Sequence, residues 1–313
     1  MPSPVLEVSH LAKSYGDFRA VNDLSFEVGP GEVFGFLGPN GAGKTTTLRM
    51  ILGLLPSDAG QVRLFGQPWA RPLLRRVGYL PEERGLYRRM KAAEAVAFFA
   101  RLKGLDGRRA RMRAIDLLGR LGLGAVVGRR VEDLSRGMAQ KVQLAAAIAH
   151  GPDLLILDEP FSGLDPLNQQ LIEGIFRGEA AAGRSIVFST HTMQQAERLC
   201  RRVLILKGGA KAFEGTVEEA RRLLPRRVRL EAPADLSFLG ALPGVSALMA
   251  PSDGRRGWEA VLAADTEPGA LLAACVERGV TPTRFDSSEP TLHEVFVAVA
   301  GAQGHDLPTD EAA

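Results

Sequence analysis

The chain has 313 residues, of which 45% are hydrophobic and 24% are charged, and its mean hydropathy is zero. This composition is typical of a globular protein and excludes disordered, collagen-like and disulfide-rich chains. The net charge is +3, with a net +9 over residues 1–225 and a net −6 over residues 226–313. The length predicts two domains, and no apolar run reaches the roughly 18 residues that a membrane span needs.

The first thirty residues alternate between apolar and polar side chains, with a break at Gly16 and Asp17. This period of two predicts antiparallel strands joined by a turn. Strand patterns then recur, separated by helical stretches, at residues 33–37, 77–80, 154–157, 185–189 and 202–206. Such alternation predicts a mainly parallel α/β sheet. Residues 91–150 have only helical periodicity, so we interpret them as a helical subdomain inserted into the sheet.

A second domain is predicted after Pro225. The segments RVRLEA, SALMA and WEAVLAA have strand patterns, and a helix at 268–277, a strand near Thr283 and a helix at 291–299 follow. These patterns predict a small α+β domain over residues 226–301. The polar residues 302–313 are expected to form a disordered tail.

A glycine-rich segment, GPNGAGKTT, follows the strand predicted at 33–37 and matches the pattern G-x-x-x-x-G-K-[ST]. Its glycines allow successive backbone N–H groups to face phosphate oxygens, and the helix that follows directs its positive end at the same anion. We expect Lys44 to reach the β- and γ-phosphates and the Thr45 hydroxyl to ligate Mg²⁺. The predicted nucleotide-binding residues of this loop are Gly38, Pro39, Asn40, Gly41, Ala42, Gly43, Lys44, Thr45 and Thr46.

Two carboxylates follow the apolar strand predicted at 154–157. Asp158 is expected to hold the Mg²⁺ shell, and Glu159 is expected to polarise the attacking water. A strand that ends in carboxylates can also lead into a simple helix cap. The nucleotide interpretation therefore depends on the phosphate loop that the same chain carries.

Between these elements lies DLSRGMAQKVQLA, whose residues 134–138 resemble the LSGGQ signature of ATP-binding-cassette (ABC) ATPases. Three further residues resemble motifs of that family: Tyr15 the aromatic that stacks on adenine, Asp165 the end of the D-loop, and His191 the switch histidine at the γ-phosphate. Tyr15 could instead pack between strands, and His191 could cap a helix. The resemblance covers about residues 5–225 and implies a P-loop NTPase cassette with an antiparallel β subdomain.

The resemblance implies that the protein binds ATP and Mg²⁺ and hydrolyses ATP as a homodimer. In the family, the signature residues, here Ser135 and Gly137, close over ATP held by the opposite subunit. Two positions depart from the family's commonest form: Arg136 and Met138 replace Gly and Gln. At the Q-loop position Glu82 replaces glutamine, and we expect it to bind Mg²⁺ or orient water, the alternative being a surface loop residue.

The segments YLPEERGLY and LSRGM resemble the ATPase subunits of bacterial exporters of the sodium-extrusion and drug-resistance type. The resemblance implies a cytoplasmic subunit, peripheral on the inner face of the cell membrane, that docks on separate permease subunits. Residues 84–101, with Leu86 and Tyr87 expected to be exposed, are the predicted permease contact. The second domain resembles the accessory domain of such exporters, and both a dimer or regulatory contact and a small-molecule sensor stay open for it.

Two other functions fit part of the sequence. A basic first domain could serve a nucleic-acid or ribosome-linked ATPase, and a degenerate cassette could bind ATP without hydrolysing it. The single cassette, with neither a long heptad insertion nor cysteine ligands, argues against the first, so no nucleic-acid partner is expected. The set Lys44, Asp158, Glu159 and His191 argues against the second. The transported substrate is not encoded in these motifs.

Overall fold

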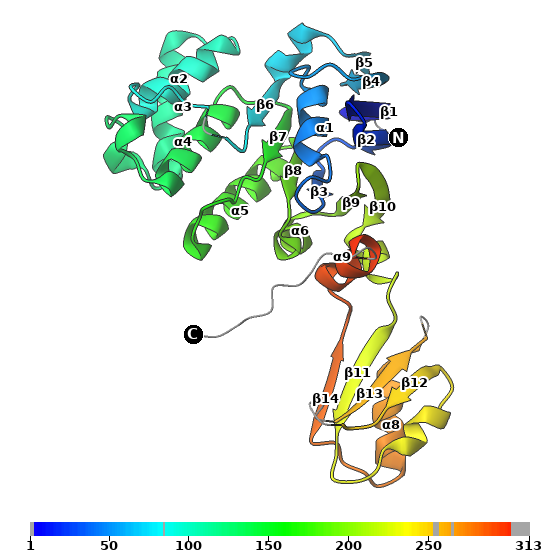
Figure 1. Ribbon diagram of the computed structural model, residues 1–313. Helices are drawn as coiled ribbons and strands as arrows, with labels where there is room; N and C mark the ends of the chain where they lie inside the picture. Colours follow the sequence, from blue (N-terminus) through cyan, green and yellow to red (C-terminus); the bar gives the residue numbers. More distant parts are fainter. Residues whose placement is uncertain (1–2, 84, 253–256, 264–265, 302–313) are drawn as a thin grey trace, which may run out of the picture. The chain divides into compact units, whose positions relative to one another are not determined.

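The computed structural model describes residues 3–83, 85–252, 257–263 and 266–301. The chain divides into two compact units, Met1–Gly215 and Thr216–Ala313 (Figure 1). This division precedes the boundary predicted at residue 225, because helix α7 (Val217–Arg221) packs on helix α9 (Leu292–Ala300) of the second unit. The predicted tail, 302–313, lies outside the described residues.

The first unit is built on a six-stranded sheet, as the strand patterns predicted. In spatial order its strands are β10 (Ala210–Thr216), β9 (Arg202–Lys207), β3 (Val33–Leu37), β8 (Ser185–Thr190), β7 (Leu154–Asp158) and β6 (Val77–Leu80). The five strands from β9 to β6 pair in parallel. Parallel strands bring their carboxyl ends to one edge of a sheet. The loops after β3, β6, β7 and β8, which carry the predicted site residues, therefore meet at that edge.

A second, antiparallel sheet supplies the other layer of this core. Its strands, in spatial order, are β2 (Phe18–Val28), β1 (Leu6–Tyr15), β4 (Ala59–Leu64) and β5 (Gln67–Pro68). Strands β1 and β2 form the predicted hairpin, with Tyr15 opposite Phe18 at its tip. The ring of Phe26 on β2 stacks on that of Phe34 on β3, with centroids 5.7 Å apart. The two sheets thus share one apolar core.

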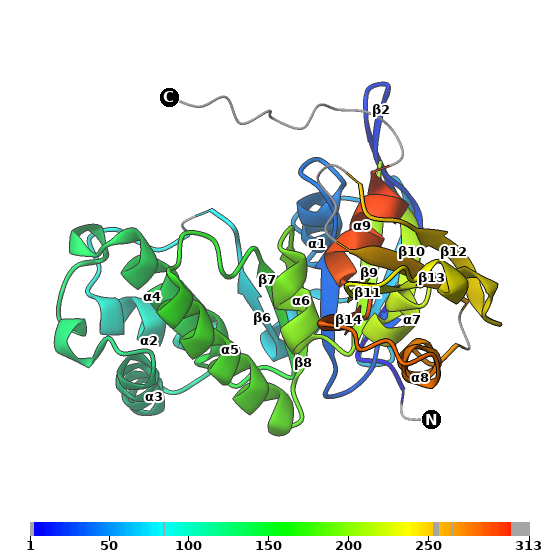
Figure 2. The same ribbon diagram turned by 90° about the horizontal axis from the view of Figure 1, so that it is seen from below.

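Helices complete the first unit in two groups. The first group, α2 (Ala92–Leu102), α3 (Gly107–Arg120) and α4 (Arg136–Ile148), forms the predicted inserted subdomain, which both views show as a lobe beside the sheets (Figures 1 and 2). The second group packs on strands of the six-stranded sheet and comprises α1 (Lys44–Ile51), α5 (Pro166–Ala181) and α6 (Met193–Leu199). Short 3-10 turns lie at Arg71–Arg76, Gly124–Val126 and Val131–Asp133.

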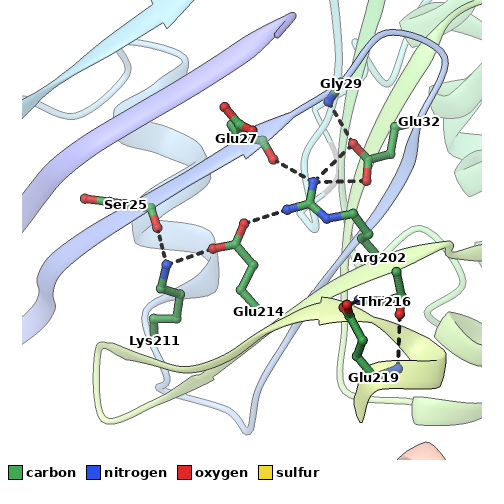
Figure 3. Close-up of polar contacts among 9 residues, drawn as sticks. All are labelled: Ser25, Glu27, Gly29, Glu32, Arg202, Lys211, Glu214, Thr216 and Glu219. Atoms are coloured by element: carbon green, nitrogen blue, oxygen red, sulfur yellow. Dashed lines mark hydrogen bonds and ion pairs between the residues drawn. The ribbon is translucent and has the colours of Figure 1, made fainter. Parts of the chain in front are cut away.

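The last strand of the first unit is held by a half-buried ion-pair network (Figure 3). Arg202 on β9 donates to Glu214 on β10 at 2.8 Å and to Glu32 at 3.3 Å, and Lys211 donates to Glu214 at 2.7 Å. Charged pairs of this kind stabilise most when they form a network that satisfies every partner. Strand β10 is therefore anchored on the cassette up to the residue where the second unit begins.

The second unit is an α+β domain built on one antiparallel sheet. In spatial order its strands are β12 (Val245–Met249), β13 (Trp258–Leu262), β11 (Arg226–Glu231) and β14 (Arg284–Ser288). Helix α8 (Gly269–Glu277) and the 3-10 turn Ser237–Ala241 cover one face of this sheet. Val228 and Leu230 point into that core, whereas Arg227 and Arg229 alternate with them on the opposite, exposed face. In the described parts of both units, every helix falls short of the length and apolar character needed to cross a membrane.

Candidate nucleotide site

The phosphate loop connects β3 to α1, and its geometry depends on glycine. Gly43, the residue before α1, has a φ of +94°, and a Cβ added there would lie 2.3 Å from the carbonyl oxygen of Ala20. A larger residue at this position would have to displace backbone. Helix α1 begins at Lys44, so its free N–H groups face the loop.

Two backbone carbonyls of the phosphate loop hold the side chain of Lys44 in place. Its side chain is 7% exposed, and Nζ donates to the carbonyl oxygens of Gly38 at 2.7 Å and Pro39 at 3.1 Å. Burial lowers the pKa of Lys44, and the nearby carboxylates of Glu159, Asp158 and Glu82 oppose that shift. The carboxylates thus help to keep Lys44 charged, and a desolvated ammonium next to the N-terminus of a helix attracts phosphate strongly.

One hydroxyl from the neighbouring strand binds both residues at the end of β7, Asp158 through its carboxylate and Glu159 through its backbone N–H. Ser189 Oγ on β8 donates to Asp158 Oδ1 at 2.5 Å and accepts from the backbone N–H of Glu159 at 3.0 Å. The second oxygen of Asp158, Oδ2, is buried and has no hydrogen-bond partner. A buried, unpaired carboxylate oxygen is costly unless a ligand binds it.

Glu159 adopts a backbone conformation that is rare for residues other than glycine, with φ at +47°. Such strain persists only where surrounding contacts impose it, and it is concentrated at functional sites. Here the contacts are the bond to Ser189 and a 2.9 Å contact between Glu159 Oε1 and Nδ1 of His191. Because an ionised carboxylate only accepts, His191 is the donor in this pair.

Lys44, Glu159 and His191 line one pocket of about 400 Å³, whereas the predicted residues Gly38, Pro39 and Asp158 are not among its lining residues. Eleven of its lining residues were predicted from the sequence: Tyr15, Asn40, Gly41, Ala42, Gly43, Lys44, Thr45, Thr46, Glu82, Glu159 and His191. Tyr15 is 51% exposed, which does not fit an aromatic packed between strands. His191 lies one residue before the N-cap of α6, which is Thr192, and contacts Glu159.

The comparisons with known proteins agree with this geometry. Residues 21–162 match the family described as "ABC transporter", and residues 215–300 match "ATP-binding protein DrrA1-3-like, C-terminal domain". The ABC transporter ATP-binding protein YhaQ of Bacillus subtilis is 37% identical over 95% of this chain and 99% of its own length. The chain belongs to the ABC transporter ATP-binding proteins. It is accordingly an ATPase of a family that hydrolyses ATP for transport.

Two further comparisons cover the cassette. The Nod factor export ATP-binding protein I of Paraburkholderia xenovorans is 43% identical over 69% of this chain and 72% of that protein. A solved structure of the ATP-binding subunit of an ABC transporter superposes with a TM-score of 0.65, at 34% identity, over 70% of this chain and 92% of the other. The predicted P-loop cassette fold is thereby confirmed.

In this ABC ATPase the signature residues Ser135 and Gly137 and the D-loop residue Asp165 do not line the pocket of the same chain. Ser135 is the N-cap of α4, and its hydroxyl accepts from the N–H of Met138 at 3.3 Å. Asp165 is the N-cap of α5 and accepts from the N–H of Asn168 at 2.9 Å. Gly137 lies next to the D-loop, since a Cβ there would be 3.3 Å from the side chain of Leu164.

Several residues of this region were not predicted as nucleotide-site residues from the sequence. Phe18 lines the pocket, and its place opposite Tyr15 in the hairpin was a usable signal. Ala20 also lines it, and Ser189 binds the carboxylate of Asp158 and the backbone N–H of Glu159, but these two residues have no distinctive spacing. Ser162, the first residue of the D-loop segment 162–165, lines the pocket as well. In the predicted permease contact, Leu86 is buried (9% exposed), so its expected exposure was wrong. Leu86 is apolar, and its side chain is buried although it lies in a loop.

Proposed function

We propose that this ABC ATPase is the energy-coupling subunit of an exporter, working as a homodimer with two ATP molecules at its interface and docked on separate permease subunits. The main support for the proposed dimer is the position of the signature residues: Ser135 and Gly137 do not line the pocket that contains Lys44. A second copy would supply them. Helix α4, whose N-terminus they form, would then direct free N–H groups at the γ-phosphate of the facing site.

The export direction is supported by the relatives. A protein named for Nod factor export is 43% identical to the cassette, and the match to the DrrA1-3-like C-terminal domain extends the likeness beyond the cassette. The basic charge of the first domain offers the nucleic-acid alternative no comparable support, because these matches are to transporter proteins. We therefore retain export as the function, without a named substrate.

In the proposed reaction, water attacks the γ-phosphorus of ATP and the bond to the β–γ bridging oxygen breaks. Glu159 accepts a proton from the water, while the His191 contact fixes the direction of its carboxylate. Lys44 and the N–H groups of the loop stabilise the charge that develops on the phosphate oxygens. Tyr15, with the neighbouring Phe18, offers an exposed aromatic surface for the adenine ring.

The residues present also fit Mg²⁺. Asp158 Oδ2 is the buried carboxylate oxygen without a partner, and oxygen ligands are those that Mg²⁺ prefers. Thr45 and Glu82 line the pocket, as does Glu159, the residue after Asp158, and Asp158, Thr45 and Glu82 would hold the ion. When bound, Mg²⁺ would neutralise phosphate charge and so favour attack at the γ-phosphorus.

The proposed permease contact is an aromatic cluster on the helical subdomain. The ring of Tyr87, 56% exposed, meets Phe98 edge to face at 5.4 Å and stacks on Phe99 at 6.2 Å. Exposed aromatic residues on a rigid base are typical of protein interfaces. Tyr87→Ala should reduce co-purification with the permease and transport, and intact values for both would exclude this contact.

The dimer is tested by light scattering of purified wild type and Glu159→Gln with ATP. The variant should accumulate as an ATP-dependent dimer, because it binds ATP but cleaves it slowly. Its monomer mass should persist with ADP, which lacks the γ-phosphate that the signature would contact. A monomer under saturating ATP, with ATP binding verified by calorimetry, would contradict the dimer arrangement.

A further inference from the structure

Helix α4 presents three long side chains to two loops near the pocket, the loop between β7 and α5 and the loop after β6. Arg136, Gln140 and Gln143 are spaced by four and three residues, which puts them on one face of a helix. A Cβ added at Gly163 in the D-loop would lie 2.8 Å from Arg136 Nε. Gln140 Nε2 donates to the carbonyl oxygen of Pro160 at 3.4 Å, in the loop after Glu159.

The third contact is the best formed. Gln143, 5% exposed, donates from Nε2 to the carbonyl oxygens of Pro81 and Glu83, each at 3.0 Å. A primary amide has two N–H groups, so one side chain can bind both carbonyls. These carbonyls belong to the two residues that flank Glu82. With both neighbours fixed, the backbone of Glu82 is fixed, and so is the direction in which its side chain leaves the chain.

Glu82 itself depends on this support. Its side chain is exposed and lines the pocket together with Lys44 and Thr45. The loop follows β6, a strand of four residues at the end of the sheet order. A carboxylate on such a loop acts reproducibly only if its backbone is held from another element.

We infer that Gln143 is a positioning residue: it holds Glu82 towards the ATP site and links that carboxylate to the helix that begins with the signature. This inference rests on the proposed role of Glu82 at Mg²⁺ and ATP. A movement of α4 would thereby be transmitted to Glu82 through two hydrogen bonds. The signature helix of one cassette would thus influence its own ATP site as well as the facing one.

The chain contains a matched control for this arrangement. Lys103 on the helical subdomain also donates to two backbone carbonyls, those of Leu74 at 2.6 Å and Val77 at 2.9 Å. It thus holds the chain at the start of β6, whereas Gln143 holds the loop after its end. Lys103 does not line the pocket. Methionine at either position keeps an unbranched side chain of similar length and removes the donors.

The test compares Gln143→Met, Gln143→Ala and Lys103→Met with wild type in the full-length chain. Three properties are measured: ATP affinity by calorimetry with and without Mg²⁺, hydrogen exchange of the amides of residues 82 and 83, and steady-state phosphate release. Both Gln143 variants should lose about tenfold in Mg²⁺-dependent ATP affinity or turnover, the usual cost of removing a supporting partner. Their loop amides should exchange faster, and affinity without Mg²⁺ should stay unchanged. Lys103→Met should match wild type in all three, even if its melting temperature falls.

A double-mutant cycle with Glu82→Ala separates the two possible failures. If Gln143 acts through Glu82, adding Gln143→Met to Glu82→Ala should cause no further loss. If Glu82→Ala alone changes neither affinity nor turnover, the proposed role of Glu82 is wrong. If Glu82→Ala is impaired while the Gln143 variants match wild type, or lose activity additively with it, the inference about Gln143 is overturned. Gln143→Ala, which leaves room for water at the two carbonyls, supplies the answer if Gln143→Met does not fold.

Discussion

In the first unit the buried carboxylate of Asp158 keeps one oxygen without a partner, whereas in the second unit the buried carboxylate of Glu259 is paired with Arg227 at 3.0 Å. The first arrangement lowers the stability of the free protein, and this stability is recovered only when a ligand binds the unpaired oxygen. The second is complete without a ligand. The cassette is therefore built for chemistry, with strain at Glu159, while the C-terminal unit has the properties of a self-contained accessory domain.

The largest expected effect belongs to the phosphate loop. Lys44→Met should weaken ATP binding by about 2–5 kcal/mol, the usual cost of removing one member of a buried charge pair. Lys103→Met is the matched control, because it also removes an ammonium bound to two backbone carbonyls, in this case a half-buried one. Calorimetry should find near-normal ATP affinity for the Lys103 variant. Equal losses in both would mean that the effect is structural.

A cavity created by mutation in the core of the second unit should lower its stability without lowering ATP turnover. Leu230 is fully buried in its core, and Leu230→Ala should destabilise that unit by about 2–5 kcal/mol. ATP turnover of Leu230→Ala should stay within twofold of wild type at temperatures where the variant and the wild type are both folded. The equally buried Leu204→Ala, on β9 of the cassette, should lower both the melting temperature and turnover. Loss of turnover in Leu230→Ala would show that the second unit contributes to the ATP site.

The first unit should lose stability in weakly acidic solution because of His150. Burial, with the cation of Lys103 nearby, lowers the pKa of His150 to about 4, and a hydrogen bond with the backbone of Val77 only partly opposes that shift. The unfolded chain, with a pKa near 6.5, then binds more protons than the folded chain between these values. Stability should therefore fall as the pH drops from about 6.5 to about 4, by roughly 3 kcal/mol in total. Urea unfolding of His150→Phe should lack this loss, whereas the exposed His293→Asn should retain it.

The smallest expected effect compares two helix caps. Ser135 caps α4 in the cassette and Thr291 caps α9 in the second unit, each accepting a backbone N–H bond. Replacing either by alanine should cost about 1 kcal/mol of stability. Only Ser135→Ala should also weaken ATP-dependent dimerisation, measured by light scattering in a Glu159→Gln background. Equal dimerisation of the two variants would remove Ser135 from the proposed interface.

Much of this molecule could be predicted from local sequence. The phosphate loop, the strand ending at Asp158 and the hairpin at Gly16 have short patterns whose physics is local. The loops meet at one edge of the sheet because the strands are parallel and their C-terminal ends lie at that edge. These features were predictable because each depends on neighbours in the chain.

The remaining features depend on contacts between distant segments. Gln143 lies about sixty residues from the carbonyls that it binds, and Ser189 lies about thirty residues from the carboxylate of Asp158 that it binds. The two compact units divide at Gly215, before the predicted boundary, because α7, with its own capping box at Thr216, follows β10 directly in sequence but packs on α9. No single-sequence pattern contains those partners.

The central claim, that Glu159 is the catalytic base of an intact ATP site, is tested most directly by phosphate release from wild type and Glu159→Gln, with ATP affinity measured in the same preparations. We predict unchanged or tighter ATP binding and a turnover lower by about 10²–10⁴-fold, the usual contribution of a general base. Wild-type turnover in Glu159→Gln would contradict the claim.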